Sequence, residues 1–166
     1  NFQKPNKILL QKSDDFEGTF EFKPLEPGFG QTIGNSLRRI LLSSLEGNAI
    51  SAVRIAGIDH EFATIKGVLE DVVDIILNIK QIRLKPAIED AELNEEKIYL
   101  TIRGKTELKA GDIEEHTNIF KVMNPDQHLC FMDESVNLEM ELTVTRGRGY
   151  VSADENLPKD APIGVI

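Results

Sequence analysis

The chain has 166 residues and carries 19 Lys and Arg against 28 Asp and Glu, a formal net charge of −9. A surface that follows a phosphate backbone usually shows a basic excess, so this balance argues against an autonomous nucleic-acid-binding protein. Apolar residues make up 40% and charged residues 28% of the chain, which predicts a folded protein of one domain or two small ones, not a disordered tail.

Neither a membrane span nor a disulfide is predicted. No apolar run approaches the roughly 18 residues that cross a bilayer, and the first residues lack the apolar stretch of a signal peptide. Cys130 is the single cysteine, which excludes an internal disulfide and a metal site built from several thiolates. We therefore expect a cytoplasmic protein without membrane contact. Because the chain starts without Met and ends in the apolar residues 162–166, we also expect it to be a fragment.

The first 32 residues predict two strands and a loop. Residues 7–12 and 19–23 have the alternation of short strands, with turn-forming residues between them. Residues 24–30 contain two prolines and two glycines, which predict a loop that leads into a helix. Thr32 is the expected N-cap of that helix.

The next segment predicts a helix with two occupied sides. Apolar residues recur at helical spacing and cover one arc at Ile33, Leu37, Ile40, Leu41 and Leu45. Gly47 and Asn48 are the expected C-cap. Opposite the apolar arc, Asn35, Arg39 and Leu42 form one small patch. A solvated arginine would explain Arg39 alone, but an apolar residue beside a guanidinium is also a mixture typical of protein interfaces.

The remaining residues predict one more helix and a mainly β-sheet structure. Residues 50–55 alternate like a strand, and residues 68–80 predict a helix with Leu69, Val72, Ile75, Ile76 and Ile79 inward. Five β-type runs follow, at residues 82–85, 98–103, 119–122, 128–132 and 136–146. Residues 87–96 predict an exposed acidic loop and residues 133–135 a hairpin loop between the last two strands. The predicted fold class is α+β.

Several residues are candidates for catalysis or for ligand binding. Gly28, Gly30 and Gly34 could cradle a phosphate before the first helix, but their spacing matches neither the dinucleotide fingerprint nor the P-loop, which favours glycines needed for a tight loop. The three histidines have no partner at metal-ligand spacing, and Cys130 lies in an apolar run that favours burial. Residues 146–150, RGRGY, could bind single-stranded RNA through the arginines and the aromatic ring. The alternative is a turn or bulge at a strand end, with both arginines solvated. We expect no cofactor and no metal.

One segment carries a family resemblance. Residues 25–44, LEPGFGQTIGNSLRRILLSS, closely resemble the signature helix of the bacterial RNA polymerase α-subunit family. Residues 57–62, 67–72, 76–80 and 146–151 resemble further family segments in the same order, so the resemblance covers essentially the whole chain. Ser36 departs from the alanine that is usual in the family.

The resemblance implies a noncatalytic assembly subunit of RNA polymerase that homodimerises and then receives the large β and β′ subunits. It implies that residues 1–46 are the first part of a dimerisation domain completed beyond residue 166, and that residues 47–166 are an inserted β-rich domain. Residue-by-residue transfer implies that Arg39 contacts β and that Lys80 contacts β′. Asn35 and Leu42 are added to the expected β contact because they lie in the same helix patch as Arg39. The candidate dimer surface consists of Phe29, Leu37, Ile40, Leu41 and Ser44. The alternative is that all of these except Ser44 fill the core of a single protomer.

Three functions therefore remain as hypotheses at this point. The first is the polymerase scaffold, with a second α subunit, β and β′ as partners and with no direct contact of this fragment to nucleic acid. The second is a small-ligand or phosphate-binding domain that uses residues 28–34, and the third is an RNA-binding module centred on residues 146–150.

Overall fold

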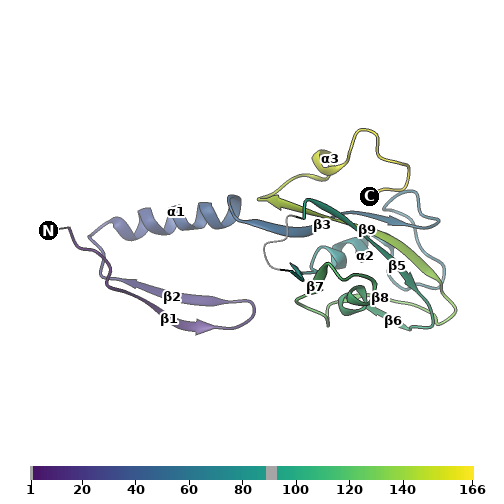
Figure 1. Cartoon of the computed structure of the whole chain (residues 1–166), viewed down its shortest axis with the longest axis horizontal. Coiled ribbons are helices and arrows are strands. Elements are labelled where there is room, and N and C mark those ends of the chain that lie inside the picture. The colour runs from purple at the N-terminus through teal and green to yellow at the C-terminus, as the bar shows by residue number, and fades with distance from the viewer. Residues whose placement is uncertain (1, 89–92) are drawn as a thin grey trace. The chain divides into compact units, whose positions relative to one another are not determined.

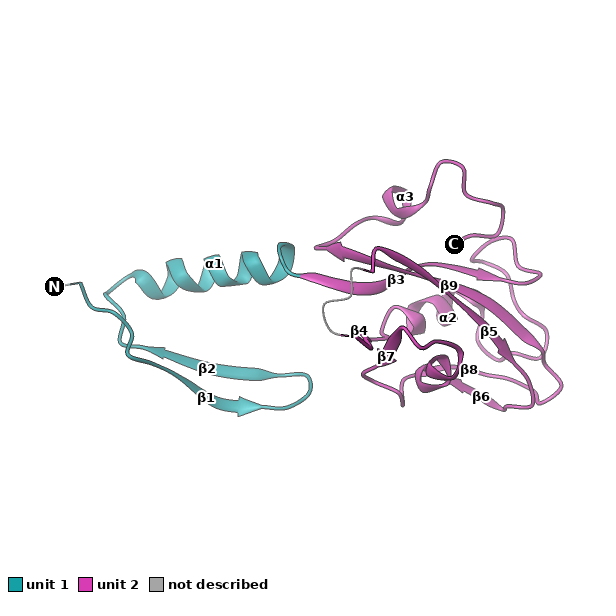
Figure 2. Ribbon diagram, viewed as in Figure 1, with its two compact units in different colours: residues 1–45 teal, residues 46–166 magenta. Residues whose placement is uncertain are grey.

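The computed structural model describes residues 2–88 and 93–166, and the chain forms two compact units, residues 1–45 and 46–166 (Figures 1 and 2). Each unit combines helix and strand, which confirms the predicted α+β class. Of the predicted acidic loop, Glu89, Asp90 and Glu92 lie outside the described residues, and Glu95 and Glu96 belong to a strand.

Unit 1 begins with the predicted strand pair. Strand β1 (Lys7–Ser13) and strand β2 (Gly18–Lys23) are antiparallel, with Ile8 opposite Phe22 and an irregularity in register after Leu10. The Asp14 carboxylate closes the turn, because it accepts the amide hydrogens of Phe16 and Glu17 at 2.8 Å each. This Asx-type turn fixes the register of the two strands.

Helix α1 (Phe29–Ser43) starts earlier than the sequence predicted. The chain turns into it at Gly28, whose φ of 87° is left-handed, and the Phe29 amide donates to the Glu26 carbonyl at 3.1 Å. Thr32 is inside the helix and is not its N-cap, so that prediction was wrong. A backbone turn at glycine replaces the side-chain cap that the sequence rule expects.

The end of α1 also differs from the prediction. Ser44 is the C-cap, and its amide donates to the Ile40 carbonyl at 2.9 Å. Gly47 and Asn48 are not a C-cap, because both lie in strand β3 (Glu46–Ile55). That strand pairs with another part of the chain over its whole length, and long-range pairing of this kind overrides the local preference of a Gly-Asn pair for a helix end.

Unit 2 is built on a five-stranded sheet of order β5-β9-β3-β4-β7. Its members besides β3 are β4 (Leu84–Pro86), β5 (Glu95–Ile102), β7 (Phe120–Val122) and β9 (Leu138–Arg148). A separate two-stranded sheet joins β6 (Glu107–Lys109) and β8 (His128–Phe131). The helical elements are α2 (Val72–Ile79), the 3-10 helix η1 (Ala110–His116) and α3 (Ala153–Asn156).

The core of unit 2 is one apolar cluster, to which α2, the five-stranded sheet, η1 and the two-stranded sheet all contribute side chains. Strand β9 shows the predicted alternation, since its core-facing side chains are all nearly inaccessible at Leu138, Met140, Leu142 and Val144. Val72, Ile75 and Ile79 of α2 belong to the same cluster. A period of two on the strand and a period of 3.6 on the helix therefore converge on one apolar interior.

Helix α2 is shorter than predicted, because Asp71 is its N-cap and accepts the Asp74 amide at 2.9 Å. Leu69 consequently precedes the helix, and its side chain is 78% exposed and not inward as predicted. The predicted hairpin at residues 133–135 was also wrong. Strand β8 pairs with β6, whereas β9 lies between β3 and β5 in the larger sheet. Turn-forming residues between two strands do not by themselves make the strands partners, because long-range pairing competes with the local hairpin.

The C-terminal residues return to the sheet. Ile166 and Val53 exchange two backbone hydrogen bonds, of 2.7 and 2.9 Å. Gly164, with a φ of 88°, lies so close to the carbonyl oxygen of Ile58 that an added Cβ would come within 2.8 Å of it. Only glycine fits this close approach of two backbones.

Candidate protein-interaction site

Helix α1 has no buried residue, and within the described part of unit 1 no side chain reaches full burial. Its large apolar side chains are between 41% and 64% exposed at Phe29, Leu37, Ile40, Leu41 and Leu42. An amphipathic helix normally buries its apolar stripe against a neighbour. Four of these apolar side chains, Phe29, Leu37, Ile40 and Leu41, share one side of the helix by its 3.6-residue period, and an exposed apolar surface of this kind is typical of an interaction site.

The predicted patch of Asn35, Arg39 and Leu42 is on the surface of α1 as expected. At about 100° per residue, the three positions fall within about 60° of the helix circumference. All three side chains are exposed, and the Arg39 side chain makes no hydrogen bond or ion pair with any described residue. The Arg39 carbonyl does accept the Ser43 hydroxyl at 2.6 Å, which keeps that hydroxyl on its own helix.

The candidate dimer residues lie on the other side of the helix. Their positions, on the same helical projection, are centred nearly opposite the Arg39 patch at Phe29, Leu37, Ile40, Leu41 and Ser44. The Phe29 and Phe2 rings form a T-shaped pair at a centroid distance of 5.0 Å, and Phe29 remains 41% exposed. The helix therefore presents an apolar side and a mixed polar-apolar side, as the sequence predicted.

Lys80 is the C-cap residue of α2 in unit 2, and its side chain is exposed. The Lys80 carbonyl accepts a hydrogen bond from the Arg83 guanidinium at 3.2 Å. A cation at this position favourably complements the partial negative charge of the helix end, which explains the lysine without a partner protein. The candidate residues of α1 and Lys80 thus belong to different units.

The glycines considered for phosphate binding do not form a loop. Gly28 precedes α1, whereas Gly30 and Gly34 lie inside it. A Cβ added at any of the three would meet no atom within 4 Å, so the backbone there does not form a tight cradle. The arrangement offers a helix N-terminus but none of the converging groups of a P-loop.

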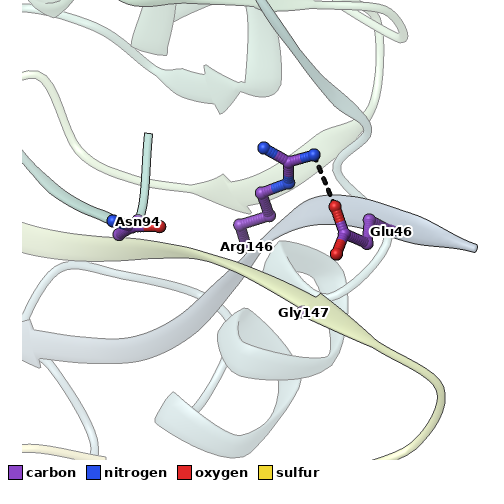
Figure 3. A pocket seen from close by; sticks show the side chains of 4 residues that line it. All are labelled: Glu46, Asn94, Arg146 and Gly147. Atoms are coloured by element: carbon purple, nitrogen blue, oxygen red, sulfur yellow. Dashed lines mark ion pairs between the residues drawn. The ribbon is translucent and has the colours of Figure 1, made fainter. Parts of the chain in front are cut away.

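The RGRGY segment begins inside a sheet. Arg146 and Arg148 are on β9 opposite Asn48 and Glu46 of β3, and both guanidinium groups pair with the Glu46 carboxylate. Hydrogen bonding to Arg148, and the charge of Arg146 beside it, lower the pKa of Glu46. Asn94 and Gly147 complete a polar pocket of about 360 Å³ here, in which Arg146 reaches across to Glu46 (Figure 3). These contacts give both arginines a structural partner that sequence spacing did not indicate.

The three histidines lie in different parts of unit 2. His60 is exposed on a loop, His116 ends η1, and the residues described here contain no group of three or more His, Cys, Asp or Glu arranged for a metal ion. His128 is a sheet residue as predicted, but its two carboxylate partners, Glu70 and Glu107, were missed.

In the described part of the chain, no helix has the length and apolar character needed to cross a membrane.

Cys130 is fully buried, and burial raises the pKa of its thiol to about 12. The thiolate is the reactive form, and burial disfavours it. We therefore expect iodoacetamide at pH 8 to alkylate Cys130 at least about a hundredfold more slowly in the folded protein than in urea. For a thiol that reacts only after local opening, this factor corresponds to an opening free energy of about 2.7 kcal/mol. Mass spectrometry of the peptide that contains Cys130 measures this rate. Equal rates in buffer and urea would contradict the buried setting.

The chain is similar to one protein family and to individual known proteins. Residues 53–166 match the family described as the RNA polymerase Rpb3/RpoA insert domain. The chain is 53% identical over 166 residues to the DNA-directed RNA polymerase subunit alpha of Flavobacterium psychrophilum, covering 100% of this chain and 50% of the relative. The corresponding subunits of Phocaeicola vulgatus and Salinibacter ruber are 50% and 48% identical, each over 99% of this chain and 49% of the relative.

The chain therefore spans about half the length of the curated relatives that it matches. The family match covers most of unit 2, and the similarity to the relatives extends through unit 1 as well. The chain belongs to the RNA polymerase Rpb3/RpoA insert-domain family, and it corresponds to the amino-terminal region of bacterial DNA-directed RNA polymerase α subunits.

Proposed function

We propose that this chain is a noncatalytic assembly scaffold of bacterial RNA polymerase, which homodimerises and recruits the β and β′ subunits. The observation that carries the proposal is helix α1, which has no buried side chain and presents two unlike sides. A helix with this pattern needs partners on both sides to remove its apolar surface from water. In this scaffold, unit 1 dimerises and binds β, and unit 2 is an inserted domain.

The two sides of α1 suit two different partners. The side with Phe29, Leu37 and Ile40 is mainly apolar, which suits a self-complementary contact between two copies of the same helix. The side with Arg39 offers a guanidinium beside an apolar Leu42, which suits a partner that supplies a carboxylate or carbonyl group. We assign the first side to the dimer and the second to β, with Lys80 as the proposed contact to β′.

The proposed scaffold supplies none of the groups of nucleotidyl transfer. That reaction is carried by metal ions that orient the substrate and stabilise the charge of the transition state, and we assign these to the large subunits. Cys130 is buried with a raised pKa, and Glu46 is engaged by two arginines, so neither has the setting of a nucleophile or general base.

Stepwise assembly tests the proposal. The full-length protein that contains this chain should form a dimer by analytical ultracentrifugation, bind purified β, and only then retain β′ on an affinity column. Titration of the protein with nucleotides and inorganic phosphate should give no stoichiometric binding. The electrophoretic mobility of single-stranded RNA should not change when the protein is added at physiological salt. A stable monomer that binds neither large subunit would refute the scaffold. Saturable phosphate binding would instead favour a ligand-binding domain.

A further inference from the structure

His128 lies between two carboxylates in unit 2. Its Nε2 is 2.6 Å from Glu70 Oε1, and its Nδ1 is 2.9 Å from Glu107 Oε1. The three residues come from different elements, since Glu70 precedes α2, Glu107 is on β6 and His128 is on β8. The side chains are partly buried, with 15% of Glu70, 31% of Glu107 and 32% of His128 exposed.

This geometry favours a doubly protonated ring. A neutral imidazole has one N–H donor and one bare nitrogen, whereas an imidazolium donates from both nitrogens. Both nitrogens of His128 face carboxylate oxygens, which only accept hydrogen bonds when ionised. Glu70 also accepts the Phe131 amide at 2.7 Å with its second oxygen, and Lys109 Nζ lies 3.9 Å from the second oxygen of Glu107. Both carboxylates are thus placed as acceptors, and the ring completes its hydrogen bonds only as a cation.

Two exposed apolar residues, Leu69 and Phe131, are bonded to each other through the backbone beside this cluster. The Leu69 amide donates to the Phe131 carbonyl at 3.0 Å, and the His128 and Phe131 rings lie 4.4 Å apart between centroids. Leu69 is 78% and Phe131 46% exposed. An isolated two-stranded sheet is only marginally stable in water, so contacts that tie β6 and β8 to the segment before α2 matter here.

We propose that His128 is a proton-dependent clamp: as an imidazolium it ties the segment before α2 to both β6 and β8 and holds Leu69 and Phe131 in position. Loss of its proton removes one of the two ring hydrogen bonds and leaves one carboxylate facing a bare nitrogen. One of the two contacts of the clamp is then weaker. As a result, the hydrogen bonds that the Leu69 and Phe131 amides donate open more often. This inference does not depend on the proposed assembly function.

The direction of the pH dependence follows from the groups that face the ring. Hydrogen bonding to Glu70, followed by that to Glu107, raises the pKa of His128 against the opposing effect of burial. Burial opposes the shift of Glu70 as well, yet hydrogen bonds from His128 and the Phe131 amide lower the pKa of that carboxyl. Two further ionisable groups among the described residues interact with these carboxylates: Lys109 on β6 lies beside Glu107, and burial together with the charge of Glu70 raises the pKa of the Cys130 thiol on β8.

Because the pKa of His128 is raised in the folded protein, its contribution to the free energy of unfolding is fully present below about pH 6.5, the ordinary pKa of histidine. This contribution is lost as the pH rises through the pKa of His128 in the folded protein. A lowered folded-state pKa of Glu70 means that its contribution is present above the ordinary carboxyl range and is lost as the pH falls through the folded value. The clamp is therefore strongest in the window between these two titrations.

Nuclear magnetic resonance of the full-length protein, labelled with ¹⁵N in histidine only, tests the clamp. The His128 signals, assigned by their loss in His128→Gln, should show both ring nitrogens protonated at pH 6.5. Glu70→Gln and Glu107→Gln should each lower the titration midpoint, and Glu70→Gln should do so more because its contact is shorter. Glu139→Gln, which removes an exposed carboxylate of β9, is the matched control and should leave the midpoint unchanged.

Hydrogen exchange of the wild-type protein gives a second, variant-free readout. Protection of the Leu69 and Phe131 amides should fall as the pH rises through the His128 midpoint, relative to the Met123 amide, which donates to the Arg83 carbonyl at 2.8 Å. A His128 ring with one protonated nitrogen at pH 6.5, or a midpoint that neither glutamine variant lowers, would overturn the proposal. Should Glu70→Gln fail to fold, Glu107→Gln and the exchange measurement still decide.

Discussion

Replacing Arg39 with alanine should weaken binding of the β subunit at least tenfold while folding and dimerisation stay near wild type. The guanidinium is exposed and makes no side-chain hydrogen bond or ion pair with any described residue, so its removal leaves no buried partner behind. Truncation of an interface hot spot costs about 2 kcal/mol or more, and every 1.4 kcal/mol corresponds to about a tenfold change in affinity. Surface plasmon resonance with purified β measures this loss.

Arg38 provides the matched control for this experiment. It is the next residue of the same helix, it is exposed, and its replacement removes the same charge. Because adjacent helix positions diverge by about 100°, Arg38 lies outside the Arg39 patch. Arg38→Ala should therefore bind β much more tightly than Arg39→Ala. Equal affinities of the two variants, or an unchanged affinity of Arg39→Ala, would show that the patch is not the β-binding surface.

Replacing Ile75 with alanine should destabilise unit 2 by about 2–5 kcal/mol, the usual cost of an Ile-to-Ala cavity in a packed core. Ile75 is fully inaccessible in α2 and belongs to the same cluster as the core-facing residues of β9. Alanine has the higher helix propensity, so the loss comes from packing and not from the helix itself. The rate of Cys130 alkylation along a urea series reports unfolding of this unit specifically.

Leu77→Ala is the control on the same helix. Leu77 is 51% exposed, so its truncation removes less buried apolar area and should cost about 1 kcal/mol or less. The two variants thus compare one apolar truncation inside the core with one at the surface. If both shifted the urea midpoint of Cys130 exposure equally, α2 would not pack against the sheet by the side that contains Ile75.

The two-sidedness of α1 could be predicted because it is a local property. The positions of Leu37, Ile40 and Arg39 on the helix follow from the 3.6-residue period alone, and no distant contact is needed to place them. The helix start could not be predicted in the same way. It depends on a left-handed glycine at residue 28 and not on a side-chain cap, and the Phe29 amide is satisfied by the Glu26 carbonyl.

Strand pairing shows the same division. The alternation along β9 predicted which side chains face the core, and burial of Leu142 and Val144 confirms it. The partner strands were missed, because residues 133–135 join two strands that are close in sequence but pair elsewhere. Alternation determines a face, whereas the choice of neighbour depends on the whole set of strands that compete for that face.

The sequence by itself determined the α+β class, the apolar face of each main element and, through its resemblance, the family that the comparisons confirm. Only the tertiary structure decided which polar groups meet. Glu70 and Glu107 are 58 and 21 residues from His128, and Arg148 is 102 residues from Glu46. Periodicity acts along one element, but an ion pair depends on distances across elements, and chain folding alone sets those distances.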